Sequence, residues 1–266
     1  MKNFIPFFKT NYDKNEFIQI KKVINSGTVS MGPVTEKFEN EISKKLKLNK
    51  DCVALVSNCT SALHLALLSS KIKPGDEVLC SSLTFVADAN SILYVGAKPV
   101  FVDIESKINL NMSVNDLKKK ITKKTKAIIM THYAGYPCQI EIIKSIAKKN
   151  NLILIEDACH TIFSKYKNKY LGLYGNYGVF SLYGNKNMTT GEGGIIISAK
   201  ENINKIKKLR NHGIEKSLKE RFNRKNPIYN ISNLGFNYRI DDLRSSLGIS
   251  QIKKIDKLNS IRKKKG

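Results

Sequence analysis

YGVFSLYGNKNMTTGEGGIIIS, residues 177–198, consists of two apolar runs on either side of a loop rich in glycine and threonine. The runs, residues 178–183 and 194–198, predict two short strands, close enough in sequence to include an antiparallel member of a sheet. The loop between them carries Lys186. A desolvated lysine amine loses its proton more readily and can attack carbonyl groups, so Lys186 is a candidate nucleophile. A solvated loop lysine is the alternative interpretation in a chain this rich in lysine.

Upstream of this stretch, short apolar runs alternate with helical patterns. The runs that predict strands cover residues 53–56, 77–80, 99–102, 127–131 and 152–155. The patterns that predict helices cover residues 61–70, 85–95, 113–121 and 140–150. Such alternation is typical of right-handed βαβ units and a parallel sheet covered on both faces. Together with the strands around Lys186, the pattern predicts an α/β fold, a three-layer α/β/α arrangement with a mostly parallel sheet of about seven strands.

Further helices are predicted at both ends of the chain. Asp13 and Glu16 have the spacing of a capping box, and apolar residues then recur on one helical face. A second amphipathic helix is expected over residues 35–48. The last helix begins at Asp241 or Asp242 as its N-cap and continues with an apolar stripe.

The composition suits a large globular domain, with 266 residues of which 41% are hydrophobic. The net charge of +24, from 46 Lys and Arg against 22 Asp and Glu, raises the question of a nucleic-acid partner. The excess is mostly lysine and is spread along the whole chain, which indicates compositional bias rather than a binding face. We therefore expect no nucleic acid; a basic surface would also suit a phosphorylated small substrate.

The five cysteines form no CxxC pair and mostly lie in apolar runs, which indicates buried thiols in a reducing compartment. No ligand-like spacing of Cys and His is present, so no metal site is expected. The N-terminal apolar patch is too short for a signal peptide, and no apolar run approaches membrane-spanning length. These features predict a cytoplasmic protein with no membrane association.

Several polar features follow the predicted strands, at the edge where parallel sheets bind ligands. Residues 57–61, SNCTS, offer hydroxyl groups and a helix N-terminus, which suit a phosphate or an ordinary N-cap. Asp157 could pair with a protonated ring nitrogen, or cap a helix or form a salt bridge; Phe85 could stack on a planar ring or fill the core. Ser181 precedes Lys186. A phosphate cradle, a stacking aromatic, an acid and a lysine for a Schiff base together match a pyridoxal phosphate site.

These residues lie in motifs that resemble the DegT/DnrJ/EryC1/StrS family of sugar aminotransferases. The matching stretches include residues 32–33 with 38–39, 57–67, 74–78, 83–90, 96–103, 156–160, 180–194, 210–213 and 235–248. They occur in the family's order and cover nearly the whole chain. The resemblance implies the large domain of the PLP-dependent transferase fold type I, the fold of aspartate aminotransferase.

The resemblance also implies roles for individual residues. Lys186 would bind the aldehyde of pyridoxal 5'-phosphate and then shuttle a proton as general base, and Asp157 would pair with the ring nitrogen. Asn237 would reach the phosphate from a neighbouring subunit, which implies a homodimer with a shared active site. The remaining cofactor contacts would be stacking on the ring by Phe85, an approach to the ring hydroxyl by His160, and phosphate binding by Thr60, Ser61 and Ser181.

The implied reaction converts a keto group of a nucleotide-linked deoxysugar to an amine, with glutamate as the donor, in cell-surface polysaccharide or amino-sugar biosynthesis. Family members that catalyse dehydration carry His in place of the lysine, so Lys186 favours transamination. We expect a PLP-binding large domain over residues 1–240, with an N-terminal helical arm over about residues 1–50. Residues 241–266 would begin a long helix leading to a C-terminal domain that family chains carry and this chain lacks. An inactive or split-gene fragment, acting as a scaffold or half-enzyme, is the alternative.

Overall fold

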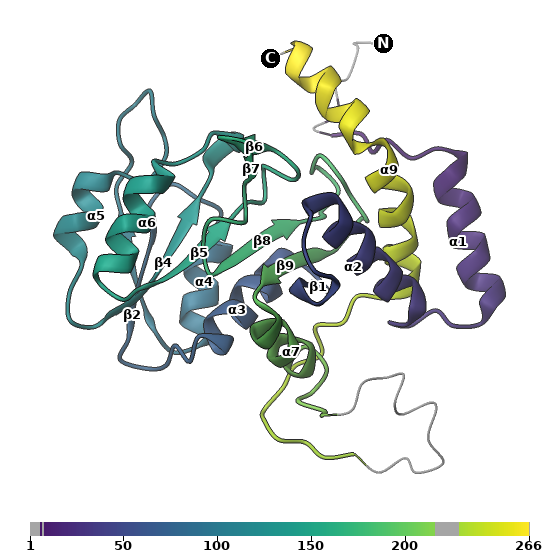
Figure 1. Cartoon of the computed structure of the whole chain (residues 1–266), viewed down its shortest axis with the longest axis horizontal. Coiled ribbons are helices and arrows are strands. Elements are labelled where there is room, and N and C mark those ends of the chain that lie inside the picture. The colour runs from purple at the N-terminus through teal and green to yellow at the C-terminus, as the bar shows by residue number, and fades with distance from the viewer. Residues whose placement is uncertain (1–5, 7, 216–228, 266) are drawn as a thin grey trace.

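The centre of the computed structural model is a seven-stranded sheet in the order β1-β9-β8-β5-β4-β2-β3 (Figure 1). The model describes residues 6, 8–215 and 229–265. The strands are β1 (Val53–Val56), β2 (Glu77–Ser81), β3 (Lys98–Val102), β4 (Thr125–Thr131), β5 (Ile153–Asp157), β8 (Tyr177–Ser181) and β9 (Gly194–Ser198). Strand β9 runs antiparallel to both of its neighbours, and the other pairs are parallel. The mostly parallel seven-stranded sheet predicted from the sequence is therefore confirmed.

Helices cover both faces of the sheet, because successive strand residues point to opposite sides and both sides are apolar. Helices α3 (Cys59–Ser69), α4 (Ala87–Tyr94) and α7 (Lys200–Leu209) pack on one face, in a core that includes Val78 and Ile129. On the other face, α5 (Val114–Lys120) and α6 (Ile140–Lys149) pack over Leu79 and Ile128. Helices α2 (Pro33–Leu46) and α9 (Asp242–Lys265) cover the β1, β9 and β8 part of that face. This is the predicted three-layer arrangement.

The two ends of the chain meet at one side of the molecule, where α9 packs against both α2 and α1 (Lys14–Ser26) (Figure 1). The expected capping box of Asp13 and Glu16 begins α1. The alternatives for the N-cap of α9 are resolved, since Asp241 Oδ1 accepts the N–H of Arg244 at 2.7 Å. The carboxylate of Asp242 instead caps α2, where it accepts the N–H groups of Gly32, Val34 and Thr35.

The sequence patterns did not predict some short elements. These are the 3-10 turns η1 (Lys50–Cys52) and η2 (Tyr133–Gly135), and the hairpin of β6 (Lys165–Tyr166) and β7 (Lys169–Tyr170). The hairpin turns through Lys167 and Asn168, both with positive φ, without the glycine that would have signalled the turn. Within the described part of the chain, no helix has the length and apolar character needed to cross a membrane.

Candidate active site

The strand register brings the predicted site residues to one edge of the sheet. Gly194 at the start of β9 pairs with Val56 at the end of β1 on one side and with Ser181 at the end of β8 on the other. In the next strand, Asp157 at the end of β5 pairs with Val179. Three features therefore converge at this edge, as expected for the carboxyl ends of parallel strands. They are the loop after β1, the end of the strand that leads to the lysine loop, and Asp157.

The N-terminus of α3 lies against this edge. The Asn58 side chain accepts the N–H of Ser61 at 2.8 Å, while the Ser61 hydroxyl donates to the Asn58 carbonyl at 2.7 Å. This cap leaves the N–H groups of Cys59 and Thr60 without intrahelical acceptors, so the helix end can bind an anion. A Cβ at Gly194 would lie 2.4 Å from the Asn58 carbonyl oxygen, so only glycine allows β9 to pack this closely. The N-cap interpretation of residues 57–61 is confirmed, with Asn58 as the cap and Ser61 as its partner in a capping box, and phosphate binding at this helix end stays a prediction.

Threonine side chains hold the loop that carries Lys186. Thr189 donates its hydroxyl to the Leu182 carbonyl at 2.9 Å, and the N–H of Thr190 donates to the same carbonyl at 3.0 Å. The Thr190 hydroxyl bonds the Glu192 carbonyl at 2.6 Å. Both threonines are buried, and Lys186 is half-buried. These bonds join Leu182, before the lysine, to Thr189 and Thr190 after it. The loop is thus closed at its base, which fixes the direction from which Lys186 approaches the site.

Lys186 shares an open pocket of about 340 Å³ with Cys159 and His160 from the loop after β5. Ala134, Asn185 and Asn187 complete the lining. Burial lowers the pKa of His160, the positive charge of Lys186 lowers it further, and the Asp157 carboxylate opposes both effects. Sequence reasoning named Lys186 and His160 but missed Cys159, which follows Asp157 by two residues in the same motif.

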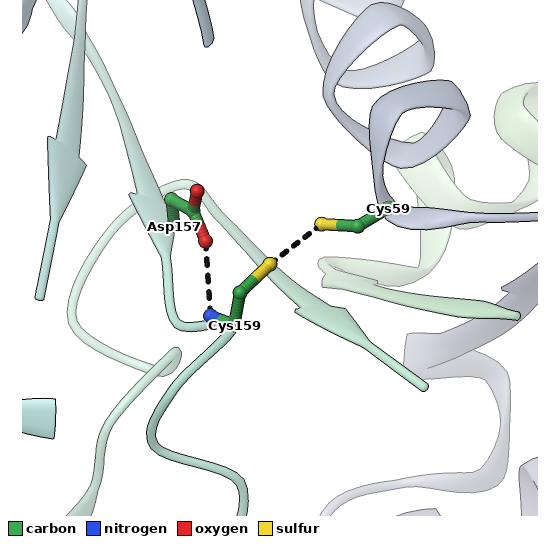
Figure 2. A group of neighbouring side chains, drawn as sticks. All are labelled: Cys59, Asp157 and Cys159. Atoms are coloured by element: carbon green, nitrogen blue, oxygen red, sulfur yellow. Dashed lines mark hydrogen bonds between the residues drawn. The ribbon is translucent and has the colours of Figure 1, made fainter. Parts of the chain in front are cut away.

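Beside this pocket, Cys59 and Cys159 place their sulfur atoms 2.9 Å apart (Figure 2). Asp157 Oδ1 accepts the N–H of Cys159 at 2.9 Å and completes a group of three potential metal ligands within 4.8 Å of one another. Two sulfur ligands of one tetrahedral zinc ion lie about 3.8 Å apart, so the observed sulfur contact is too short for shared zinc binding. The contact with Cys59, burial and the Asp157 charge raise the pKa of the Cys159 thiol well above its ordinary value, which also disfavours metal binding.

The adjacent acids Glu156 and Asp157 face different surroundings. Glu156 is fully buried and accepts the N–H groups of Gly172 at 2.9 Å, Tyr174, and Gly175 at 2.6 Å. His132 Nδ1 accepts the N–H of Cys138, so Nε2 carries a proton and donates to Glu156 at 3.2 Å. Glu156 therefore holds a loop on one side of the strand, whereas Asp157 lies beside the thiols of Cys59 and Cys159.

Phe85 and Asn237 are exposed, and neither lines the pocket that contains Lys186. Phe85 is 75% exposed, so the alternative interpretation, that this residue fills the core, is wrong. Its ring is accessible and could cover a ligand. Asn237 lies one residue before Tyr238, whose carbonyl accepts the N–H of Ser57 at 2.9 Å. Stacking by Phe85 and a contact of Asn237 with a second subunit stay predictions.

These residues fit pyridoxal phosphate. Gly194 lets β9 pack directly against the start of α3, whose free N–H groups suit a phosphate, and Asp157 offers a carboxylate to a ring nitrogen. Lys186 provides an amine in the adjoining pocket. Ser181, 8% exposed at the strand end, accepts the N–H of Tyr183 at 3.3 Å and keeps its hydroxyl proton for an anion.

Comparison with known proteins points to the same chemistry. The model of the DegT/DnrJ/EryC1/StrS aminotransferase family matches residues 10–266. Spore coat polysaccharide biosynthesis protein SpsC of Bacillus subtilis is 35% identical over 98% of this chain and 67% of its own length. A GDP-perosamine synthase of Escherichia coli O157:H7 is 36% identical over 95% of this chain and 67% of its own length.

A similar solved structure is the putative sugar aminotransferase Spr1654 of Streptococcus pneumoniae in its PMP form. It superposes with a TM-score of 0.91 at 28% identity over 98% of this chain and 70% of that chain. The same protein has also been solved in its PLP form. The present chain spans about two thirds of the length of the curated relatives it matches.

Proposed function

Because this chain belongs to the DegT/DnrJ/EryC1/StrS aminotransferase family, whose members depend on pyridoxal phosphate, we propose that it aminates a keto group of a nucleotide-linked deoxysugar. Glutamate is the proposed amino donor. The observation that carries the proposal is the shared pocket of Lys186, Cys159 and His160 beside Asp157, at the same sheet edge as the open N-terminus of α3. An amine, an acid and an anion site at one edge are the groups that this cofactor requires.

The roles proposed for individual side chains follow the resemblance to the family. The free N–H groups at the start of α3, with the hydroxyls of Thr60, Ser61 and Ser181, bind the phosphate. The Asp157 carboxylate pairs with the ring nitrogen and keeps it protonated. Phe85 covers one face of the ring, and His160 approaches the ring hydroxyl. Asn237 of a second copy completes the phosphate site in a homodimer.

When bound, the cofactor supplies an electron sink for the carbon whose proton is removed. Lys186 is the group placed to move that proton. Its Nζ would accept the proton from the carbon that bears the amino group before the transfer and return it to the carbon that bears the amino group afterwards.

The substrate class is proposed from the relatives. GDP-perosamine synthase is named for a nucleotide-linked amino sugar, and SpsC for polysaccharide biosynthesis. An excess of basic side chains, with a net charge of +24, suits a substrate with a diphosphate. We further propose that the protein works in the cytoplasm, where nucleotide sugars are made, without a nucleic-acid or membrane partner.

A half-reaction experiment tests this proposal. Protein loaded with pyridoxal phosphate is treated with glutamate, and the cofactor absorbance should change to that of the amine form. Keto-sugar nucleotides from a panel are then added, and the proposal predicts that at least one restores the original spectrum. Lys186→Ala should abolish the exchange, while Lys144→Ala, at an exposed site on α6, should leave it unchanged. Protein that stays spectrally silent with every donor and acceptor would overturn the proposal.

A further inference from the structure

A second buried acid lies beneath the proposed cofactor site. Asp88 is the second residue of α4 and is 0% exposed, and its carboxyl group lies close enough to Asp157 for the two to interact. The sequence showed Asp88 only as a single acid inside an apolar helical pattern, and the proposed mechanism does not use it. A fully buried carboxyl group is costly without a partner, so its surroundings indicate its role.

The two oxygens of Asp88 have different environments. Oδ2 accepts the hydroxyl of Thr84 at 2.7 Å and that of Thr131 at 2.6 Å. Thr131 ends β4 and pairs in register with Asp157, so this network lies directly beside the strand end that carries Asp157. Oδ1 is buried, and no hydrogen-bond donor from residues 6, 8–215 and 229–265 reaches it. An ionised carboxylate would leave this oxygen charged and unsatisfied.

The groups that face Asp88 do not offset a negative charge. Burial, and then the neighbouring Asp157, raise the pKa of Asp88 well above its ordinary value. Cys80 on β2 and Cys59 on α3 also lie within its electrostatic reach, and the pKa of each thiol is raised, so both are neutral. Within the described ranges, no lysine or arginine forms an ion pair with Asp88.

Two adjacent buried carboxyl groups cannot both be ionised without a large cost, so one of them holds a proton. Asp157 is the better site for the charge, because the backbone N–H of Cys159 donates to its Oδ1 and because it lies beside Cys159, which lines the open pocket. Asp88 has only neutral hydroxyl donors, and both act on Oδ2. The proton therefore belongs on Asp88 Oδ1, the oxygen that no other donor reaches.

We propose that Asp88 is a neutral carboxylic acid whose Oδ1 proton is shared with Asp157, and that it keeps Asp157 ionised and oriented toward the ring nitrogen of the cofactor. Asp88 is then a positioning residue, since it acts through Asp157. This role rests on the proposed function, because Asp157 needs its charge only if it pairs with a protonated ring nitrogen. The protonation of Asp88 itself is a property of the protein without cofactor.

The first test measures that proton without any cofactor. Infrared spectra of wild type and Asp88→Asn are compared at pH 7.5, in the region of the C=O stretch of protonated carboxylic acids. The proposal predicts one such band in wild type that is absent from Asp88→Asn. Identical spectra in this region would overturn it. Because no cofactor is present, this result is independent of whether the proposed aminotransferase activity exists.

The second test asks whether Asp88 acts through Asp157. Asn at position 88 keeps a neutral group that can both donate and accept hydrogen bonds, whereas Ala removes both functions. Asp88→Asn should bind pyridoxal phosphate within about threefold of wild type, and Asp88→Ala about tenfold or more weakly. The pH dependence of the bound-cofactor absorbance should shift in Asp88→Ala and not in Asp88→Asn. Equal loss in both variants, or no loss in either, would overturn the positioning role. If Asp88→Ala fails to fold, Asp88→Leu, which is close to aspartate in shape and has no hydrogen-bonding group, takes its place in the same comparison.

Discussion

The neighbouring acids Glu156 and Asp157 should respond in opposite ways to the same small change, the replacement of a carboxylate by an amide. Glu156 is surrounded only by donors, the N–H groups of Gly172, Tyr174 and Gly175 and the Nε2 of His132. The NH₂ group of Glu156→Gln must face some of these donors. Asp157 accepts one backbone N–H, from Cys159, which an asparagine oxygen can still accept.

The arrangement sets the size of the expected effects. The amide of Glu156→Gln leaves at least two buried donors without an acceptor, at about 1–3 kcal/mol each, so the free energy of unfolding should fall by about 2–6 kcal/mol. Asp157→Asn removes a charge beside the buried Asp88, and its unfolding free energy should change by less than about 1 kcal/mol. Its affinity for pyridoxal phosphate should fall about tenfold or more, because a charge-assisted bond to the ring nitrogen is lost.

Urea unfolding of the cofactor-free variants, followed by cofactor titration of the folded proteins, measures both quantities. The expected result is a Glu156→Gln protein that is less stable but binds the cofactor once folded, and an Asp157→Asn protein with the reverse properties. The separation of a structural acid from a cofactor-binding acid would be refuted if Glu156→Gln kept wild-type stability. A loss of several kcal/mol in Asp157→Asn with unchanged cofactor affinity would refute it equally.

Further predictions concern the surroundings of the site and the core. Gly194→Ala should weaken cofactor binding about tenfold or more, read by titration, because its methyl group would lie 2.4 Å from the Asn58 carbonyl oxygen; unchanged affinity would contradict the close packing. Diamide should oxidise Cys59 and Cys159 to one disulfide, seen by mass spectrometry as a loss of two hydrogens that links these two residues; a different pairing would contradict the observed sulfur contact. Although burial opposes it, ion pairing lowers the pKa of Glu39, so the stability its charge provides is present above the unfolded pKa and is lost on acidification. The difference in unfolding free energy between wild type and Glu39→Gln should therefore narrow as the pH falls below about 4.3, and a constant difference would contradict this.

The fold was predictable because its signals are local. Each strand of the sheet is a short apolar run, and all except the edge strand β3 are mostly buried on both faces, so the sequence pattern located all seven. Helix ends were less certain: α3 begins at Cys59, two residues before the predicted start, because Asn58 rather than a later residue is its cap. The capping of α2 by Asp242 joins residues about 210 positions apart, and no local pattern reports such a contact.

The candidate site was partly predictable for the same reason. Lys186, Asp157 and residues 57–61 follow strands, and the edge rule for parallel sheets brings them together. The environment of each group was not predictable, because it depends on neighbours from other strands. Asp88 is distinguished from an ordinary helix acid only by its contacts with β4 and β5, and the sulfur contact of Cys59 spans 100 residues.

The central claim is that Lys186 is the amine that binds pyridoxal phosphate. The most direct measurement is borohydride reduction of the cofactor-loaded protein, followed by digestion and mass spectrometry of the labelled peptide. We predict a cofactor label on Lys186, in the peptide that contains the 184–194 loop, and no comparable label on the chain's other lysines. A protein that takes up no label, or one labelled chiefly at another lysine, would contradict the claim.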